Sequence, residues 1–361
     1  MKDESKKIRL ALLGFGNAGQ AFAALLASKR EEIKARYGKD VQVTAIATAS
    51  KGNLLAASAA EGTAGAGAGG AEEIDLDAVL ADLAQHGRFT DQALLCELDT
   101  MEIVKTADYD VLIEMTPLNI LSGRPAIDHI EAAFARGKHV ITANKGPIAW
   151  KFRELQQQAL RAGCGFFYET TVMDGTPVFN LCEKTLPLAQ VSAVSGILNS
   201  TTNFILEELA RGAAYDDIME RGRAMGFIEA DPAMDIEGYD AAAKITALLN
   251  VLMDAGLTPD QVERKGIEKI TAADIKAAAE RGKVIKLICR GWRDSEGRIR
   301  ASVRPEEVDA GDMLASVNST TSVVSITTDL MKTVSIVEHE PEIEQTAYGI
   351  FGDLLRVLLE C

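Results

Sequence analysis

The chain has 361 residues, and its Lys+Arg total of 38 against an Asp+Glu total of 53 gives a formal net charge of −15. With 47% hydrophobic and 25% charged residues the composition excludes a disordered chain, and the length favours two domains. The acidic balance argues against binding to nucleic acid or to an anionic membrane surface.

The cysteines and the N-terminus predict a cytoplasmic protein. Five cysteines are scattered along the chain without a Cys-x-x-Cys pair, which is typical of reduced thiols. The apolar run after the charged residues 1–7 is too short for a signal peptide core. No uninterrupted apolar stretch approaches the ~18–20 residues that a membrane helix needs.

The first 145 residues alternate short apolar runs with amphipathic stretches. Strands are expected over residues 8–13, 41–48, 110–115 and 139–143, and helices over residues 21–36 and 126–136. This alternation favours βαβ units and a parallel sheet, hence an α/β domain over residues 1–145. A run of Ala, Gly and Ser within residues 56–71 follows no strand and is interpreted as a surface loop.

After residue 145 the alternation stops. Strands of a second sheet are expected over residues 166–168, 191–197 and 322–327, and helices over residues 202–211, 216–225, 240–255 and 346–359. This pattern predicts an α+β domain over residues 146–330. A C-terminal segment, 331–361, is expected to return to the first domain.

Gly14, Gly16 and Gly19 stand between the first expected strand and the first expected helix. Gly14 would make the tight turn, Gly16 would let the backbone approach a pyrophosphate, and Gly19 would let the helix pack on the strand. In this context the trio predicts a Rossmann dinucleotide-binding domain, and the alternative is a turn that binds nothing. The whole turn consists of Gly14, Phe15, Gly16, Asn17, Ala18 and Gly19.

The second expected strand ends without the acidic residue that binds an adenosine ribose. Ser50 and Lys51 follow it, and a hydroxyl beside an ammonium suits a 2′-phosphate better than a 2′-hydroxyl. We therefore predict NADP as cofactor, with NAD left open, unless the pair merely begins a solvated loop. Thr116 and Lys145 follow the next two strands, so both are expected at the same cofactor-binding edge, and the alternative for Lys145 is a surface lysine.

An acidic segment, 229–240, leads directly into an apolar helix. Asp240 and Lys244 stand four residues apart and share one face of that helix. A buried lysine beside a carboxylate can act as a general acid, and further carboxylates can bind an ammonium group. The alternative is an exposed ion pair at the start of a helix.

Along nearly its whole length the chain resembles the homoserine dehydrogenase family. The resemblance is carried by residues 14–19, 142–145 (Thr-Ala-Asn-Lys), 198–203 (Leu-Asn-Ser-Thr-Thr-Asn) and 229–244 (Glu-Ala-Asp-Pro, then Asp-x-x-Gly-x-Asp-x-x-x-Lys). It implies a reversible NAD(P)-dependent reduction of L-aspartate 4-semialdehyde to L-homoserine, within threonine and methionine biosynthesis.

The resemblance also implies the roles of individual residues. Lys244 would give a proton to the aldehyde oxygen, with Asp240 as its orienting or substrate-binding partner. Lys145 would be a second catalytic lysine, between nicotinamide and substrate. The positions that match the substrate-binding residues of the family are Glu229, Asp235 and Thr201. Carboxylates suit a substrate that carries an ammonium group.

The family has a monovalent-cation loop similar to residues 169–177 here. By analogy, a sodium ion would be held by oxygens of Glu169, Val172, Asp174 and Thr176. The family also favours a homodimer, so the second domain is expected both to bind substrate and to dimerise.

Two departures from the family pattern leave other functions open. Ser200 replaces a glycine in the substrate turn, which suggests a related dehydrogenase for another small amino or hydroxy aldehyde. An acidic run, 338–344, replaces the glycine-rich turn before Thr346 and would repel a cofactor's phosphates, which suggests a non-catalytic sensor of a nucleotide or an amino acid. Since the chain ends at Cys361, we expect the short form without a C-terminal regulatory domain.

Overall fold

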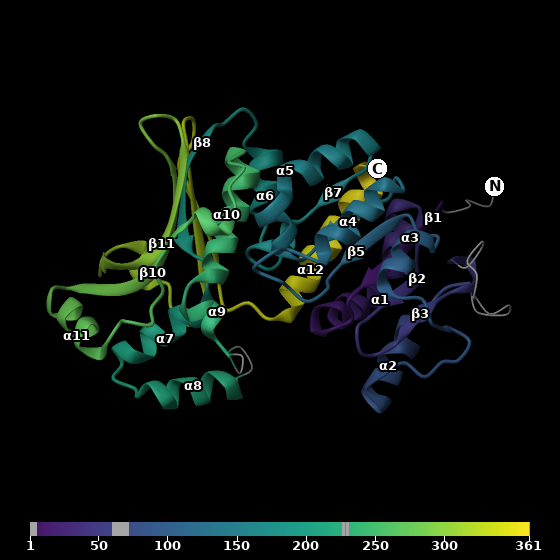
Figure 1. Ribbon diagram of the computed structural model, residues 1–361, viewed down its shortest axis with the longest axis horizontal. Helices are drawn as coiled ribbons and strands as arrows, with labels where there is room; N and C mark the ends of the chain where they lie inside the picture. The colour runs from purple at the N-terminus through teal and green to yellow at the C-terminus, as the bar shows by residue number, and fades with distance from the viewer. Residues whose placement is uncertain (1–5, 60–71, 226–227, 229–230, 361) are drawn as a thin grey trace. The chain divides into compact units, whose positions relative to one another are not determined.

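The computed structural model describes residues 6–59, 72–225, 228 and 231–360. The chain divides into two compact units, shown in Figure 1. The first comprises Met1–Pro147, Arg153–Thr176 and Glu342–Cys361, and the second Ile148–Phe152 and Pro177–Pro341. The limits predicted at residues 145 and 330 stay predictions, and most of the glycine-rich run at 56–71 lies outside the described residues.

The first unit is built around a seven-stranded sheet with the order β4-β3-β2-β1-β5-β6-β7. Its elements are β1 (Lys6–Leu13), α1 (Asn17–Tyr37), β2 (Lys39–Ala47), β3 (Asn53–Leu55), α2 (Leu76–His86), β4 (Leu95–Cys96), α3 (Thr100–Thr106), β5 (Val111–Glu114), α4 (Ala126–Ala135), β6 (His139–Thr142), part of α5 (Lys145–Ala162), β7 (Phe166–Phe167) and α12 (Ile343–Glu360). The five strands from β2 to β7 in this order are parallel, as expected from the βαβ pattern, whereas β3 and β4 extend the edge antiparallel.

One strand belongs to a different sheet from the one expected. Residues 166–168 were predicted in the second sheet, but Phe166 and Phe167 form β7, which pairs in parallel with Val140 and Ile141 of β6. That prediction was wrong because periodicity identifies a strand but not its partner. Helix α5 between β6 and β7 makes a further βαβ crossover, which keeps the strand in the first sheet.

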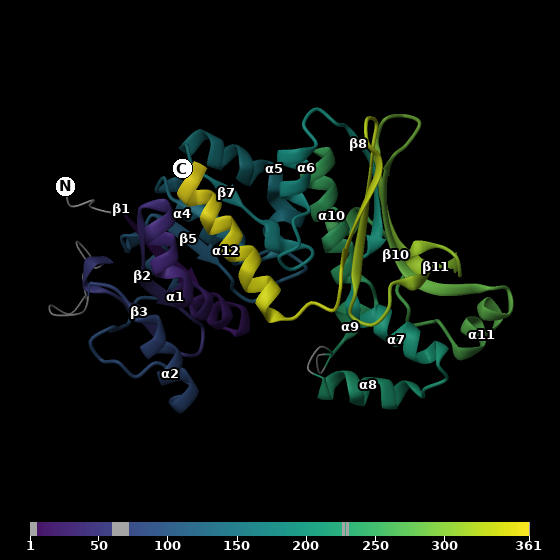
Figure 2. The same ribbon diagram turned by 180° about the vertical axis from the view of Figure 1, so that it is seen from behind.

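The sheet is buried on both faces, which explains its continuous apolar strands. Along β1, Leu10 and Leu12 point into a core shared with α1 and α12, while Ala11 and Leu13 point into a core shared with α3 and α4. Figure 2 shows α12 lying beside α1, although the two helices stand at opposite ends of the sequence.

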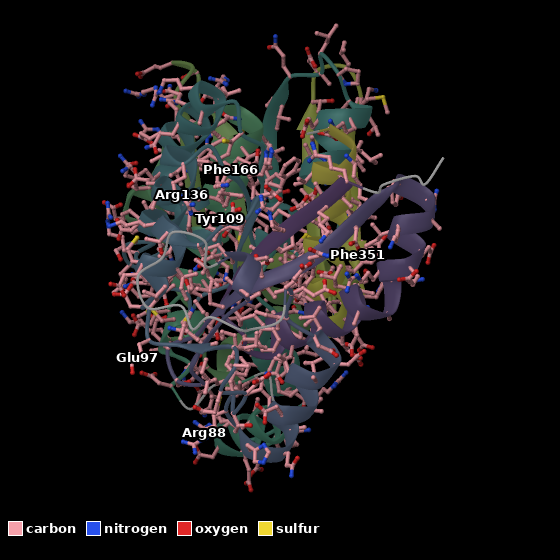
Figure 3. The ribbon with its side chains drawn as sticks, turned by 90° about the vertical axis from the view of Figure 1, so that its right-hand side faces the viewer. Arg88, Glu97, Tyr109, Arg136, Phe166 and Phe351 are labelled. Carbon is pink, nitrogen blue, oxygen red and sulfur yellow. The ribbon has the colours of Figure 1, made fainter. Side chains whose placement is uncertain are left out.

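A buried tyrosine anchors the α3–α4 side of this unit. Figure 3 shows Arg136 beside Tyr109, and the guanidinium carbon lies 5.2 Å from the ring centroid. The Tyr109 hydroxyl donates to the Val104 carbonyl at 2.8 Å, and Arg136 donates to the same carbonyl and to that of Ala107. Burial raises the pKa of Tyr109 to about 12, so this ring stays neutral.

The second unit has a six-stranded sheet with the order β13-β12-β8-β10-β11-β9. Its elements are α6 (Phe179–Thr185), β8 (Val191–Ile197), α7 (Ser200–Ala210), α8 (Tyr215–Ala224), α9 (Ala233–Ile236), α10 (Tyr239–Met253), β9 (Glu263–Arg264), α11 (Ala272–Glu280), β10 (Lys283–Arg293), β11 (Ile299–Asp309), β12 (Ser322–Thr328) and β13 (Lys332–Glu338). Its strands are antiparallel neighbours except for the parallel pair β11 and β9, and the α+β class is confirmed. Within the described part of the chain no helix has the length and apolarity to cross a membrane.

Candidate active site

The cofactor residues predicted for the first unit follow four adjacent parallel strands. In the order β2-β1-β5-β6, the carboxyl ends of these strands meet at one edge of the sheet. At this edge the strand order reverses between β1 and β5. Ligands usually bind at such a position in an open α/β sheet. The predicted residues that follow these strands are Ser50 and Lys51, the turn 14–19, Thr116, and Lys145.

The three glycines of the turn meet three different steric environments. Gly14 has a φ of 89°, and a Cβ there would lie 2.3 Å from the Met115 carbonyl oxygen. A Cβ on Gly19 would lie 2.8 Å from the Gly14 oxygen, so the first turn of α1 packs tightly on the strand exit. A Cβ on Gly16 would meet no heavy atom within 4 Å. Only Gly16 therefore borders open space, as a position beside a pyrophosphate requires.

Of the other residues of this turn, Phe15 can offer the cofactor only its backbone. Phe15 is 1% exposed and its ring packs edge-on against Phe89 at 5.8 Å. Asn17 and Ala18 begin α1, whose N-terminus has no side-chain cap. The uncapped amide groups of this helix suit the negative charge of a diphosphate, so the turn fits a dinucleotide.

Lys51 folds back toward the glycine turn. The exit from β2 is closed by Thr48, whose hydroxyl donates to the Gly52 carbonyl at 2.8 Å and accepts from the Lys51 amide at 2.9 Å. The Lys51 ammonium donates to the Phe15 carbonyl at 3.1 Å. Ser50 at the tip of this exit is exposed. The turn thus carries a cation to the edge of the predicted dinucleotide site.

A cavity of about 400 Å³ lies beside Ser50 and Lys51. Its lining includes Ser50, Lys51, Gly52, Arg88, Phe89 and Thr90. Arg88, an exposed residue labelled in Figure 3, adds a second positive charge that sequence reasoning missed. No local signal marks it, because it is brought to Lys51 by the return of the chain after α2.

The ends of β5 and β6 are joined by hydrogen bonds around Glu114. This residue is 0% exposed, and its carboxylate accepts from the Thr116 amide at 2.9 Å and from the Thr142 hydroxyl at 3.0 Å. The Thr142 oxygen accepts from the Asn144 amide at 3.0 Å. Asn144 caps α5, and Lys145 is the first residue of that helix. Thr116 and Lys145 are therefore held by one network.

In the second unit an asparagine joins two of the predicted carboxylates. The Asn199 side-chain amide donates to Asp235 at 2.6 Å and to Asp240 at 2.9 Å. Its carbonyl oxygen accepts from the Thr202 amide, which caps α7. Sequence reasoning gave Asn199 no role, although an Asn three residues before Thr202 at a helix start is a recognisable capping signal.

Lys244 lies on the inner side of α10 and not on an exposed helix face. Its ammonium donates to the Leu198 carbonyl at 2.8 Å and lies 3.6 Å from Asp240. The side chains of Lys244 and Asp240 are 20% and 12% exposed. Nearby Cys289 is fully buried, and burial raises the pKa of its thiol to about 12. The lysine is thus part of a compact polar cluster with Asp235, Asp240 and Asn199.

The two carboxylates of this cluster influence each other. Burial raises the pKa of Asp235, and the negative charge of Asp240 raises it further. Hydrogen bonds from Asn199 and Thr201 and the positive charge of Lys244 oppose that rise. Thr201 is 4% exposed, so it faces the cluster and not solvent. Two carboxylates and one ammonium leave this cluster with the excess of negative charge that attracts a cationic group.

The remaining predicted site residues are Glu229 and the sodium ligands. Glu229 lies outside the described residues. The predicted sodium ligands, all in the first unit, are Glu169, Val172, Asp174 and Thr176. Glu169 is buried and its amide donates to Asp353 at 2.9 Å, while the Asp174 carboxylate accepts from the Thr346 hydroxyl at 2.8 Å. No group of three or more His, Cys, Asp or Glu residues that could hold a metal occurs among the residues described.

The acidic run 338–344 is divided between the units. Glu338 ends β13 and is buried, Glu340 has a φ of 43°, and Ile343 begins α12. Thr346 follows within that helix. The acidic side chains therefore lie at the end of β13, in the connection that follows and at the start of α12, and their effect on a cofactor stays a prediction.

A parallel α/β sheet with this glycine turn, together with a lysine beside paired carboxylates, defines a dinucleotide-dependent oxidoreductase. Comparison with known families identifies the family of oxidoreductases to which this chain belongs. The model of the homoserine dehydrogenase family matches residues 177–355, and the model of its NAD-binding domain matches residues 14–169. The chain belongs to the homoserine dehydrogenase family, and its activity is NAD(P)-dependent homoserine dehydrogenation.

Individual relatives agree with this assignment over nearly the whole chain. An NAD(+)-dependent homoserine dehydrogenase of Pseudomonas canavaninivorans is 33% identical over 97% of this chain and 96% of its own length. The homoserine dehydrogenase of Methanocaldococcus jannaschii is also 33% identical, over 96% of this chain and 98% of its own. A solved homoserine dehydrogenase from Thiobacillus denitrificans has a TM-score of 0.79 at 28% identity, covering 98% of this chain and 73% of that one. Of the three functions that the sequence left open, the family match selects the first.

Proposed function

We propose that the polar cluster of the second unit binds L-homoserine or L-aspartate 4-semialdehyde and that Lys244 carries the proton of the reaction. The observation that carries this proposal is the Lys244 ammonium held between the Leu198 carbonyl and Asp240. When bound, the nicotinamide cofactor supplies or accepts the hydride. Lys244 gives a proton to the carbonyl oxygen in reduction and takes it back in oxidation, and its charge stabilises the developing alkoxide.

The other residues of the cluster bind and orient the substrate. Asp240 holds the Lys244 ammonium in place, and Asn199 holds Asp240. Asp235, with Glu229 from the same segment, is proposed to bind the ammonium group of the amino acid. The Thr201 hydroxyl donates a hydrogen bond to the Asp235 carboxylate, which favours the ionised form of that carboxylate. In the first unit Lys145 is proposed as the second catalytic lysine.

The direct experiment is oxidation of L-homoserine by the purified full-length chain. With homoserine and either NADP or NAD, absorbance of the reduced cofactor should rise, and the reverse reaction with L-aspartate 4-semialdehyde should consume it. Other small hydroxy amino acids serve as comparison substrates. Absence of turnover with both cofactors would contradict the proposal.

NADP is proposed as the preferred cofactor because two cations border the cavity after β2. Lys51 and Arg88 line it together with the hydroxyl of Ser50. Such donors bind a 2′-phosphate more strongly than a 2′-hydroxyl. The NAD(+)-dependent relative of Pseudomonas canavaninivorans shows that the other preference occurs in a similar sequence.

Replacing Lys51 by alanine is expected to raise KM for NADP by about tenfold and to leave KM for NAD nearly unchanged, because a charge-assisted bond to phosphate is lost. Arg88→Ala should act in the same direction. Lys105→Ala, a change of an exposed lysine on α3, is the matched control. Equal changes of KM for both cofactors would show that Lys51 does not recognise the phosphate.

Two further expectations belong to the same proposal. Oxygens of Glu169, Val172, Asp174 and Thr176 would hold a sodium ion, and oxygen ligands suit a hard cation of this kind. Thermal unfolding with sodium and with a large organic cation in its place tests this binding.

A homodimer is proposed from the family resemblance, and light scattering of the full-length chain tests it.

A further inference from the structure

Glu114 is a buried acid to which the reaction as described gives no role. It is the last residue of β5 and has no exposed surface. Its carboxylate accepts three hydrogen bonds, two from the amide and hydroxyl of Thr116 and one from the hydroxyl of Thr142. Burial raises the pKa of Glu114 to about 7, against these three hydrogen bonds, which lower it. A fully buried ionisable group costs stability unless it is bonded in this way.

The hydrogen bonds continue from Glu114 to the start of α5. The Thr142 oxygen accepts from the Asn144 amide, and the Asn144 side chain donates to the Thr116 carbonyl at 3.2 Å. The Asn144 oxygen accepts from the Gly146 amide at 3.0 Å. These bonds form a closed ring that joins the end of β5, the end of β6 and the first turn of α5. Lys145 stands in the chain between Asn144 and Gly146, which are joined by one of these bonds.

The same strand end also touches the glycine turn. The Met115 amide donates to the Leu13 carbonyl at 2.7 Å, and the Met115 carbonyl oxygen is the atom that a Cβ on Gly14 would meet. Residues 114–116 therefore connect the turn 14–19 on one side with the start of α5 on the other. A shift of Thr116 would be transmitted to both.

We propose that Glu114 is a positioning residue that fixes Thr116 and the start of α5 for the bound cofactor. The inference rests on the proposed function, in which Thr116 contacts the cofactor and Lys145 takes part in catalysis. A hydrogen-bond acceptor is required here because donors converge from two residues, and an apolar side chain would leave those donors buried without acceptors. Glu114 itself acts through its neighbours and touches no reacting atom.

The test compares Glu114→Ala with Glu114→Gln in the full-length protein. Loss of a buried acceptor corresponds to about a tenfold effect or more, so Glu114→Ala should weaken binding of reduced NADP at least about tenfold and lower kcat. The glutamine oxygen can accept both bonds from Thr116 and its amide can donate to the Thr142 oxygen. Glu114→Gln should therefore bind reduced NADP within about threefold of the wild type. Cofactor fluorescence measures binding without turnover, and thermal unfolding checks the fold.

Thr142→Val separates the two branches of the network. It removes the branch that runs from Glu114 through Thr142 to the Asn144 amide, and it keeps both bonds between Glu114 and Thr116 and the bond from Asn144 to the Thr116 carbonyl. We therefore expect kcat to fall while binding of reduced NADP stays near wild type. Wild-type binding and kcat in Glu114→Ala, or equal damage by alanine and glutamine, would overturn the proposal. If Glu114→Ala does not fold, a wild-type kcat in Thr142→Val overturns it instead. A Lys145→Ala variant with full kcat would contradict the role of Lys145. Cofactor titrations of the Glu114 variants would still test separately whether Glu114 positions Thr116.

Discussion

Replacing Lys244 by alanine is expected to lower kcat by about 10²- to 10⁴-fold, the usual contribution of a general acid. The ammonium is the only proposed proton carrier of the polar cluster, and its removal also leaves Asp235 and Asp240 without the cation that offsets their repulsion. Binding of reduced NADP should be unchanged, because the glycine turn belongs to the first unit. The measurement is kcat in the homoserine direction beside a cofactor fluorescence titration.

Lys276→Ala is the matched control for this experiment. Lys276 lies on α11 of the same unit and is exposed, so its loss should alter kcat by less than about twofold. A Lys244→Ala enzyme that is folded, binds cofactor and keeps kcat within a few-fold of the wild type would assign the proton transfer to another group. In that case Lys145 becomes the candidate.

The second large effect is expected from alanine at Gly14, which should destabilise the protein by more than about 2 kcal/mol and abolish cofactor binding. A left-handed φ of 89° costs an L-residue about 1–2 kcal/mol, and the added Cβ also meets the Met115 oxygen at 2.3 Å. That oxygen belongs to the backbone directly after β5, where the Met115 amide is bonded to the Leu13 carbonyl of β1, so it cannot move without disturbing the sheet. Thermal or denaturant unfolding measures the loss.

Gly16→Ala is the contrasting variant in the same turn. Its φ of −76° is compatible with alanine, and the new Cβ meets no protein atom within 4 Å. Unfolding free energy should therefore change by less than about 0.5 kcal/mol, while KM for the cofactor rises because the methyl group occupies the path of the pyrophosphate. Equal stability of the two variants, or a wild-type KM in Gly16→Ala, would contradict the roles assigned to these glycines.

Much of the first unit could be predicted from local pattern. The apolar runs that became β1, β5 and β6 are buried on both faces, so each is continuous in sequence and ends at a turn residue. The spacing of the glycines has a structural reason, because each glycine meets a different steric constraint. In the second unit α7, α8 and α10 begin and end within a few residues of their predicted limits.

The hairpin of β10 and β11 could not be predicted in the same way. In β10 the apolar residues Val284, Ile285, Leu287 and Ile288 have a spacing that fits one face of a helix as well as a strand. Only pairing with β8 and β11 makes the extended conformation favourable. The two-residue strand β7 shows the same limit, because its partner is chosen by the crossover through α5.

The order of residues alone identifies which side chains are candidates for the chemistry. Lys244 and Asp240 share a helix face at a spacing of four, and the turn 14–19 has the glycine spacing that a dinucleotide-binding turn requires. The fold decides what surrounds them. Asn199 lies 36 and 41 residues from the carboxylates that it joins, and Thr142 lies 28 residues from Glu114. Hydrogen-bond partners of this kind depend on three-dimensional proximity, which no local pattern encodes. The net charge of −15 can be counted from the sequence, but only the fold shows which carboxylates are held in fixed positions by such partners.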